Sequence, residues 1–164
     1  MTSIVRPAWM TSTARPDQPD AALLLREYMT EMVERYRRRP ALPGEVDAAL
    51  AEMPSDDLTE PTGLLLLVHH GGDLAGCAGL RWEPGWAELT RVFLRREHRG
   101  AGGGAAMLAA VEEHARAVGA DRIRLDTRAD LVEARTLYAR HGYREIPAYS
   151  RGPYADHWFE KRLS

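Results

Sequence analysis

The chain has 164 residues, of which 45% are hydrophobic and 28% are charged, and its formal net charge at pH 7 is -2. These values are typical of one globular domain with a buried core, and they exclude a disordered chain. The small net charge gives no general attraction to nucleic acid or to a membrane surface, so neither is expected as a partner.

The N-terminal third predicts a strand followed by two helices. A short strand is expected over residues 3–9 (SIVRPAW), before the turn-rich stretch TARPDQPD. Apolar residues then recur at helical spacing from Ala21 to Tyr36, and Asp20 is the expected N-cap. A second, shorter helix is expected over Glu45 to Met53, where Pro54 ends it.

The middle of the chain predicts three strands. The runs GLLLLVHH (63–70) and LAGCAGLRW (74–82) flank the turn residues GGD, which is a strong hairpin signal. Polar and apolar residues alternate over Trp86 to Leu94, as in a third strand. Cys77, the only cysteine, lies inside the second of these strands, which excludes an intrachain disulfide and a cysteine-clustered zinc site.

The C-terminal half predicts alternating helices and strands. A helix follows the glycine-rich stretch and is closed by Gly119, a strand covers 122–127 (RIRLDT), and a helix covers 131–140. Two final strands are expected in YREIPAY and HWFEKRL. The expected fold class is therefore α/β, with a central mixed, mostly antiparallel sheet flanked by helices, in a single domain whose first nineteen residues are partly irregular.

The stretch EHRGAGGGAAML (97–108) places four glycines directly before a predicted helix. Each glycine disfavours a helix by about 0.5–1 kcal/mol relative to alanine, so a plain turn does not account for all four. The first amides of a helix lack internal partners and lie at the positive end of the helix dipole, so a glycine-rich loop at this place suits a phosphate group.

Two known phosphate-binding loops fit this stretch poorly. A P-loop requires Gly-Lys-Ser/Thr, which is absent. Gly100, Gly102 and Ala105 do satisfy the dinucleotide pattern G-x-G-x-x-A, with Asp126 at the end of a later strand. That fold needs several more parallel strands, however, and only 38 residues follow Asp126.

The motif Arg99-x-x-Gly102-x-Gly104 resembles the R-x-x-G-x-G/A loop of the GNAT superfamily of N-acetyltransferases. The segments ELTRVFLRREHRG before it and EARTLYARHGY after it resemble the entering strand and the second signature of that family, over roughly residues 20–163. The chain departs from the family at Arg96, where proline is common, and near Asp130 and Leu131, where asparagine is common.

The resemblance implies an acetyl-CoA site without a metal. The diphosphate of the coenzyme would be held by the loop and helix amides, and its pantetheine arm would lie along the preceding strand, where the main chain of Leu94 would hydrogen-bond to it. The implied cofactor-binding residues are Phe93, Leu94, Arg99, Gly100, Ala101, Gly102, Gly103 and Gly104.

The resemblance also implies acetyl transfer to an amine. Glu88, on the strand entering the loop, is the candidate general base, with an exposed strand carboxylate as the alternative. Tyr138 takes the position of the tyrosine that often serves as general acid, with a tyrosine packed on the sheet as the alternative. A main-chain N–H at Leu94 would stabilise negative charge on the thioester oxygen.

The acceptor is expected to be an amine of a small molecule or peptide, bound together with acetyl-CoA for direct transfer. The stretch GEVDAALAEMPSDDLTEP carries six acidic and no basic residues and would favour a cationic amine, although an ordinary solvated helix explains it equally well. A non-catalytic acyl-CoA sensor is the alternative function. The absence of a signal-peptide pattern leads us to expect a cytoplasmic protein, and a homodimer is compatible with the sequence.

Overall fold

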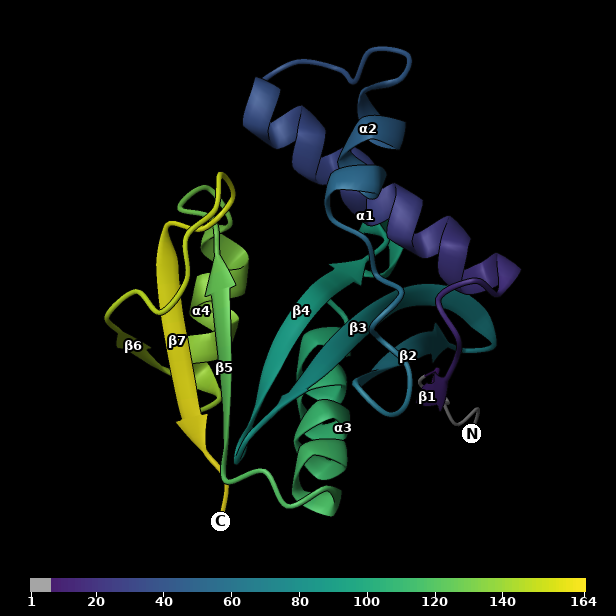
Figure 1. Ribbon diagram of the computed structural model, residues 1–164. Helices are drawn as coiled ribbons and strands as arrows, with labels where there is room; N and C mark the ends of the chain where they lie inside the picture. Colours follow the sequence, from purple (N-terminus) through teal and green to yellow (C-terminus); the bar gives the residue numbers. More distant parts are fainter. Residues whose placement is uncertain (1–6) are drawn as a thin grey trace.

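The computed structural model describes residues 7–164 (Figure 1). Its strands are β1 (Trp9–Thr13), β2 (Gly63–His70), β3 (Asp73–Glu83), β4 (Trp86–Leu94), β5 (Arg122–Thr127), β6 (Arg144–Ile146) and β7 (His157–Arg162). Its helices are α1 (Pro19–Arg37), α2 (Glu45–Glu52), α3 (Gly103–Ala117) and α4 (Val132–Arg140), with a short 3-10 turn η1 (Arg96–His98) before α3. The expected order of strands and helices is confirmed.

The seven strands form one sheet in the order β1-β2-β3-β4-β5-β7-β6. Only β4 and β5 run parallel, and all other neighbours are antiparallel. The expected mixed, mostly antiparallel sheet is therefore confirmed. The hairpin at GGD is also confirmed, with Gly71 and Gly72 both at positive φ, as a two-residue turn of the type favoured between antiparallel strands requires.

Three expected boundaries are wrong. The first strand is Trp9–Thr13, whereas a strand ending at Trp9 was expected. It pairs antiparallel with β2, from Trp9 opposite His70 to Thr13 opposite Leu66. Residues 1–6 lie outside the described part of the chain. Helix α1 is capped by Gln18 rather than Asp20, since Pro19 suits the first helical position. Strand β6 ends at Ile146 because Pro147 has no N–H to continue the ladder.

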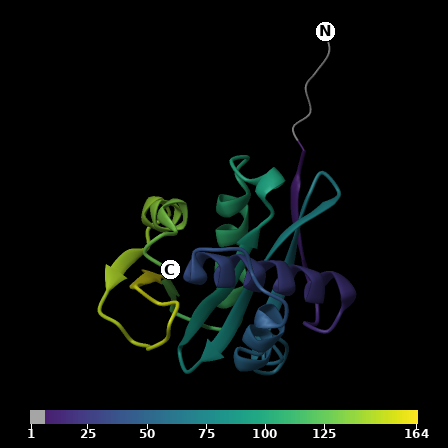
Figure 2. The ribbon, with the colours of Figure 1, turned by 90° about the horizontal axis from the view of Figure 1, so that it is seen from above.

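Helices cover both faces of the sheet. Figure 2 shows α1 and α2 on one side and α3 and α4 on the other. The apolar run in β2 serves both faces: Leu66 and Val68 join the core beneath α3, while Leu65 and Leu67 join the core beneath α1. A continuous apolar run is therefore needed in β2, because the strand is buried on both sides.

A bulge in β4 changes which face its side chains occupy. Cys77 pairs with Phe93 and Gly79 with Thr90, so that two residues, Arg91 and Val92, lie opposite one residue of β3. Arg91 has a positive φ of 55°. Before the bulge Leu89 belongs to the core beneath α3, and after it Phe93 belongs to the core beneath α1.

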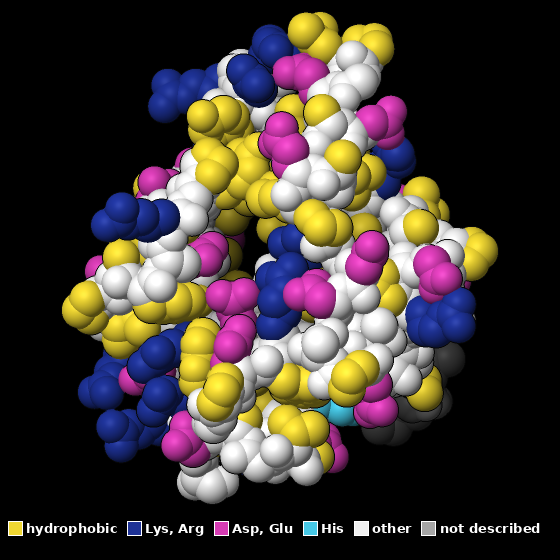
Figure 3. All heavy atoms as spheres, in the orientation of Figure 1, with side chains coloured by type: hydrophobic (Ala, Val, Ile, Leu, Met, Phe, Trp, Pro, Cys, Tyr) yellow, Lys and Arg dark blue, Asp and Glu magenta, His cyan; other side chains and the backbone are white. Residues whose placement is uncertain are grey.

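Strands β4 and β5 are joined only at their beginning. Their register consists of two pairs, Ala87 with Ile123 and Glu88 with Arg124. Beyond these pairs the strands spread apart below α1 (Figure 1), and the space-filling view is hollowed between them (Figure 3); we call this hollow the opening. The last residues of β4 and the end of β5 therefore face an opening rather than each other.

Candidate active site

The glycine-rich loop presents a row of free main-chain donors at the start of α3. Gly100 and Gly102 have φ of 77° and 88°, and Gly102 is the N-cap of α3. Within the described chain, the N–H groups of residues 100–105 have no hydrogen-bond acceptor, whereas the N–H of Arg99 donates to the carbonyl of Arg96. Six consecutive donors at a helix N-terminus form a site suited to an anion.

Two of the four glycines are required by packing rather than by backbone conformation. A Cβ on Gly103 would lie 2.5 Å from the ring of Trp9, and a Cβ on Gly104 would lie 2.6 Å from Cδ2 of Leu137. Glycine at these positions lets α3 approach β1 on one side and α4 on the other. The helix N-terminus is thereby held close to both elements.

Trp9 fixes the loop to the edge of the sheet. Its indole N–H donates to the carbonyl oxygen of Ala101 at 2.9 Å, and its ring stacks on His70 at 3.9 Å between centroids. His70 in turn lies 3.1 Å from His98, measured between the two Nδ1 atoms. No local sequence pattern predicts this cluster, because its members come from three separate segments.

The end of β4 is open toward the gap between β4 and β5. The N–H of Arg95 donates to Ala75 on β3 at 2.7 Å, and main-chain groups alternate in direction along a strand, so the N–H and carbonyl of Leu94 point away from β3. The carbonyl of Leu94 accepts a bond from Nε of Arg99 at 2.8 Å. Arg99 also reaches Glu31 on α1 at 3.0 Å.

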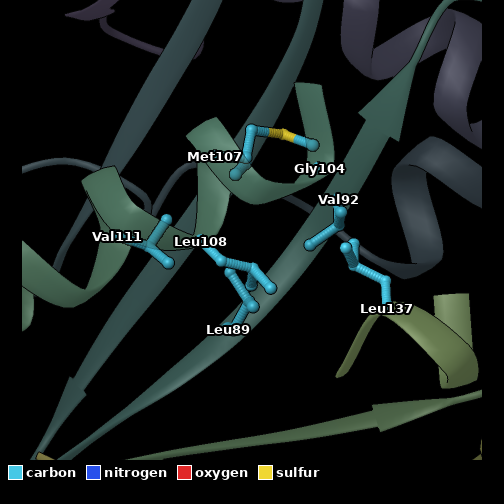
Figure 4. Close-up of a pocket in the computed structure, with 8 residues that line it drawn as sticks. Leu89, Val92, Gly104, Met107, Leu108, Val111 and Leu137 are labelled. Atoms are coloured by element: carbon cyan, nitrogen blue, oxygen red, sulfur yellow. The ribbon is translucent and has the colours of Figure 1, made fainter. Parts of the chain in front are cut away.

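A small apolar pocket lies beside this loop, between β4, α3 and α4 (Figure 4). Gly104 opens it on the side of the loop, and Leu137 closes it on the side of α4. Its lining consists of Ala78, Leu89, Val92, Gly104, Met107, Leu108, Val111 and Leu137. An apolar wall therefore continues directly from the row of free N–H groups.

Glu88 lies half-buried on the α1 side of the sheet. Its carboxylate accepts hydrogen bonds from Arg81 at 3.2 Å and from the Tyr149 hydroxyl at 3.4 Å, and Arg81 also binds Asp57 at 2.6 Å. Burial raises the pKa of Glu88 above its ordinary value, although Arg81 opposes this shift. Both oxygens of Glu88 are thus engaged within the protein.

Tyr138 lies on α4 with its ring in the core. Only 4% of the residue is exposed, and the ring contacts Tyr143 and Phe159. Its hydroxyl has no hydrogen-bond partner among the described residues. Burial raises the pKa of Tyr138 above its ordinary value, and the charges of Tyr28 and Asp126 add to the shift.

Two charged residues of the opening, Arg91 and Asp126, were not expected as residues of an acetyltransferase site. The guanidinium of Arg91 is buried and binds the Ser55 hydroxyl and the Met53 carbonyl, each at 3.1 Å, which ties the segment after α2 to the bulge. Asp126, at the end of β5, is exposed and accepts a bond from the Ser150 hydroxyl at 3.3 Å. Figure 3 shows the molecule hollowed between the β3–β4 and β5–β7 parts, with acidic and basic side chains gathered there.

The acidic stretch around α2 is partly neutralised. Arg39 forms a bidentate pair with Glu45 at 2.8 and 2.9 Å. Asp47 pairs with Arg26, and Asp57 pairs with Arg81. Three of the six carboxylates are thus compensated by arginines of neighbouring elements, so the stretch attracts cations less than its sequence indicates.

Residues 7–164 contain no group of three His, Cys, Asp or Glu side chains placed to hold a metal ion. No helix in this part of the chain is long and apolar enough to cross a bilayer.

Comparison with known proteins identifies a family. The model of the acetyltransferase (GNAT) family matches residues 24–143. A search among curated protein sequences finds no significant match.

Solved structures share the fold at low sequence identity. An acyl-CoA N-acyltransferase structure from Klebsiella pneumoniae matches with a TM-score of 0.72 and 24% identity, covering 95% of this chain and 98% of that one. A GNAT-family acetyltransferase from Staphylococcus aureus matches with a TM-score of 0.72 and 15% identity over 96% and 100% of the two chains. The PaiA N-acetyltransferase from Thermoplasma acidophilum, solved with coenzyme A, matches with a TM-score of 0.69 and 18% identity over 93% and 99%.

Proposed function

The chain belongs to the acetyltransferase (GNAT) family, and we propose that it transfers the acetyl group of acetyl-CoA to an amine of a small molecule or peptide. We propose further that it does so as a single domain over residues 1–164. The observation that carries the proposal is the row of free N–H groups over residues 100–105 at the start of α3, beside a strand end whose main chain faces the opening. Coenzyme A carries a diphosphate, which is the kind of anion that such a row binds.

The residues present fit the coenzyme. Gly100 and Gly102 keep the loop free of side-chain carbons, and no atom lies within 4 Å of the place where their Cβ would be. The main chain of Leu94 faces the opening, where it can hydrogen-bond to an amide of the pantetheine arm once Arg99 releases its carbonyl. When bound, acetyl-CoA supplies a thioester, whose acetyl carbon is open to attack by an amine.

The protein has to remove a proton from the acceptor and supply one to the leaving sulfur. An amine with a pKa of about 10.4 needs about 4–5 kcal/mol to lose its proton at pH 7. A carboxylate in the opening is therefore useful as the general base that takes this proton. The opening offers two, Glu88 and Asp126. Tyr138, whose ring lies in the core and whose hydroxyl has no partner among the described residues, is the proposed general acid.

Direct transfer between the two bound substrates is supported by the state of the cysteine. A covalent route would require an activated nucleophile such as a thiolate. Cys77 is fully buried, its thiol donates to the carbonyl of Arg91 at 3.3 Å, and burial raises its pKa to about 12. A thiol in this environment stays protonated and inaccessible.

Two measurements test the proposal. Calorimetry with coenzyme A should detect binding, and a thiol-release assay with acetyl-CoA and a panel of amines should detect turnover. Polyamines, amino sugars and basic peptides belong in the panel beside neutral and anionic amines. Binding without thiol release from any amine would favour the non-catalytic acyl-CoA sensor, and absence of binding would overturn both functions.

A further inference from the structure

We infer that Asp126, rather than Glu88, is the carboxylate that binds the ammonium group of the acceptor and takes its proton. The inference rests on the proposed function and assigns one of its steps to a residue that the family resemblance does not indicate.

The position of Asp126 on β5 places it farther than Glu88 from the point where β4 and β5 join, where the opening is wider. Glu88 is paired with Arg124, in the last register pair that joins β4 to β5. Asp126 is two residues farther along β5, on the same face as Arg124, where β4 no longer lies alongside. Its carboxylate therefore projects where the strands have parted and where the end of β4 presents the main chain of Leu94.

The two carboxylates differ in what they already bind. Glu88 accepts from Arg81 and from Tyr149, one bond on each oxygen. Asp126 has no Lys, Arg or His side chain within ion-pair distance in residues 7–164, and accepts one hydrogen bond, from Ser150, whose oxygen is held by the indole of Trp158 at 2.8 Å. Asp126 is thus anchored and still has acceptor capacity for an ammonium group.

Exposure also separates the two groups. Asp126 is exposed, whereas Glu88 is half-buried behind its partners. A general base must return its proton to solvent after each turnover, and an exposed carboxylate does this directly. Glu88 would first have to break its bond to Arg81 or Tyr149.

The charges around Asp126 support a role near the reacting atoms. Although the side chain is accessible, protein atoms around the carboxylate displace part of its water and raise its pKa above the ordinary value, while the Ser150 hydroxyl and the cations Arg91 and Arg81 oppose the shift. Burial raises the pKa of Tyr28 on α1 and of Tyr138 on α4, and the charge of Asp126 adds to both shifts.

Burial likewise raises the pKa of Glu88 and of Tyr149, and the charge of Asp126 adds to these two shifts as well. Asp126 is therefore the carboxylate whose field reaches the proposed general acid and the other acidic group of the opening at once. A base in this position adds negative charge beside Tyr138 while it is ionised and removes that charge once it has accepted the proton.

The step balances as a single proton transfer. The N–H bond of the ammonium breaks, its electron pair stays on nitrogen, and the proton moves to an oxygen of Asp126 and then to water. The neutral nitrogen forms the bond to the acetyl carbon, the C–S bond breaks, and its electron pair goes to sulfur. As the amide forms, the nitrogen loses a second proton to water, and the sulfur gains one from the Tyr138 hydroxyl, which then takes a proton back from water.

The test compares Asp126→Asn with Glu88→Gln, and uses Asp121→Asn, at the opposite end of β5, as the matched control. We expect Asp126→Asn to lower kcat/KM at pH 7 by about 10²-fold and to remove the acidic limb of the pH profile. An acceptor that is already uncharged at pH 7 should lose far less. Glu88→Gln should keep the acidic limb, and Asp121→Asn should behave like the wild type.

A second readout does not depend on turnover. In a carboxyl-carbon NMR titration of the protein bound to coenzyme A, adding a protonated amine should shift the Asp126 resonance and lower its titration midpoint. An acidic limb that survives Asp126→Asn and disappears in Glu88→Gln would overturn the inference and leave the proposed function standing. Wild-type protein that binds coenzyme A but acetylates no amine would overturn the proposed function itself.

Discussion

Nε of Arg99 lies 2.8 Å from the carbonyl oxygen of Leu94, and this bond joins the first residue of the glycine-rich loop to the end of β4. The same guanidinium reaches Glu31 on α1, in an ion pair whose side chains are 38% and 28% exposed. The side chain of Arg99 therefore braces three elements, while the anion site itself consists of the main-chain N–H groups beyond it.

This division predicts a mild phenotype for Arg99→Gln. Loss of a partly exposed ion pair should cost about 0.2–1 kcal/mol of stability. Because the donors to the diphosphate belong to the backbone, the Kd for coenzyme A should rise by less than about tenfold. Thermal melting and calorimetry measure the two effects, with Glu31→Gln as the control that removes the pair without touching the loop. Complete loss of coenzyme binding in Arg99→Gln would contradict the main-chain site.

Gly102→Ala should separate backbone strain from binding. A Cβ at Gly102 meets no atom within 4 Å, so its cost comes from the left-handed backbone, about 1–2 kcal/mol. Gly119, just beyond the other end of α3, has φ of 83° and equally open surroundings, which makes Gly119→Ala the matched control. We expect similar losses in melting temperature for both variants and weaker coenzyme A binding for Gly102→Ala alone. Equal coenzyme affinities would show that the loop conformation at Gly102 is irrelevant to binding.

Tyr138→Phe should affect turnover more than folding. The hydroxyl makes no hydrogen bond to the described residues, so its removal leaves no buried group without a partner. We expect kcat to fall by about 10²-fold with an unchanged Kd for coenzyme A and a nearly unchanged melting temperature. Wild-type turnover in this variant would assign the tyrosine to core packing alone.

Cys77→Ala should preserve turnover. The thiol is buried and protonated, and truncation to alanine leaves a small cavity that costs stability rather than activity. Thiol release per active site should match that of the wild type at a temperature where both are folded. A loss of activity in the folded variant would point to an acyl-enzyme route.

Glu45 predicts one component of the acid sensitivity of the fold. Its hydrogen bonds with Arg39 and with the N–H of Leu42 lower its pKa to about 2. Because the folded-state pKa lies below the unfolded value, this group stabilises the fold above the unfolded pKa, and the contribution is lost as pH falls from about 4.5 to about 2. The melting temperature of the wild type should therefore exceed that of Glu45→Gln at pH 7, and the difference should shrink as pH approaches 2. A constant difference would mean that the pair does not titrate as described.

Local patterns were enough to predict the elements of this fold. The turn residues between β2 and β3, the alternation in β4 and the glycines before α3 each carry their own structural signal within about ten residues. The family resemblance, rather than periodicity, led to the coenzyme loop and to Tyr138. It did not indicate that Gly103 and Gly104 are required by Trp9 and Leu137, because those contacts join distant segments.

The charged groups of the opening could not be predicted in the same way. Asp126 has the sequence context of an ordinary strand end, and its place opposite β4 follows from the insertion of β5 between β4 and β7. Arg91 is in phase with the apolar residues of the alternating strand, such as Leu89 and Phe93, yet the bulge turns its side chain toward the segment after α2. Local spacing does not predict the surroundings of a side chain when these depend on strand order or on a single bulge residue.

That extra residue also explains how a sheet strand holds a segment outside the sheet. If one residue were deleted between Thr90 and Phe93, β4 would pair with β3 without a bulge, with Phe93 still opposite Cys77 and Thr90 still opposite Gly79. The positive φ at Arg91 would be lost, and with it the bonds from its guanidinium to the Ser55 hydroxyl and the Met53 carbonyl. The bulge therefore fastens the chain after α2 to the sheet, and a one-residue deletion there should loosen that segment while it leaves the two cores in register.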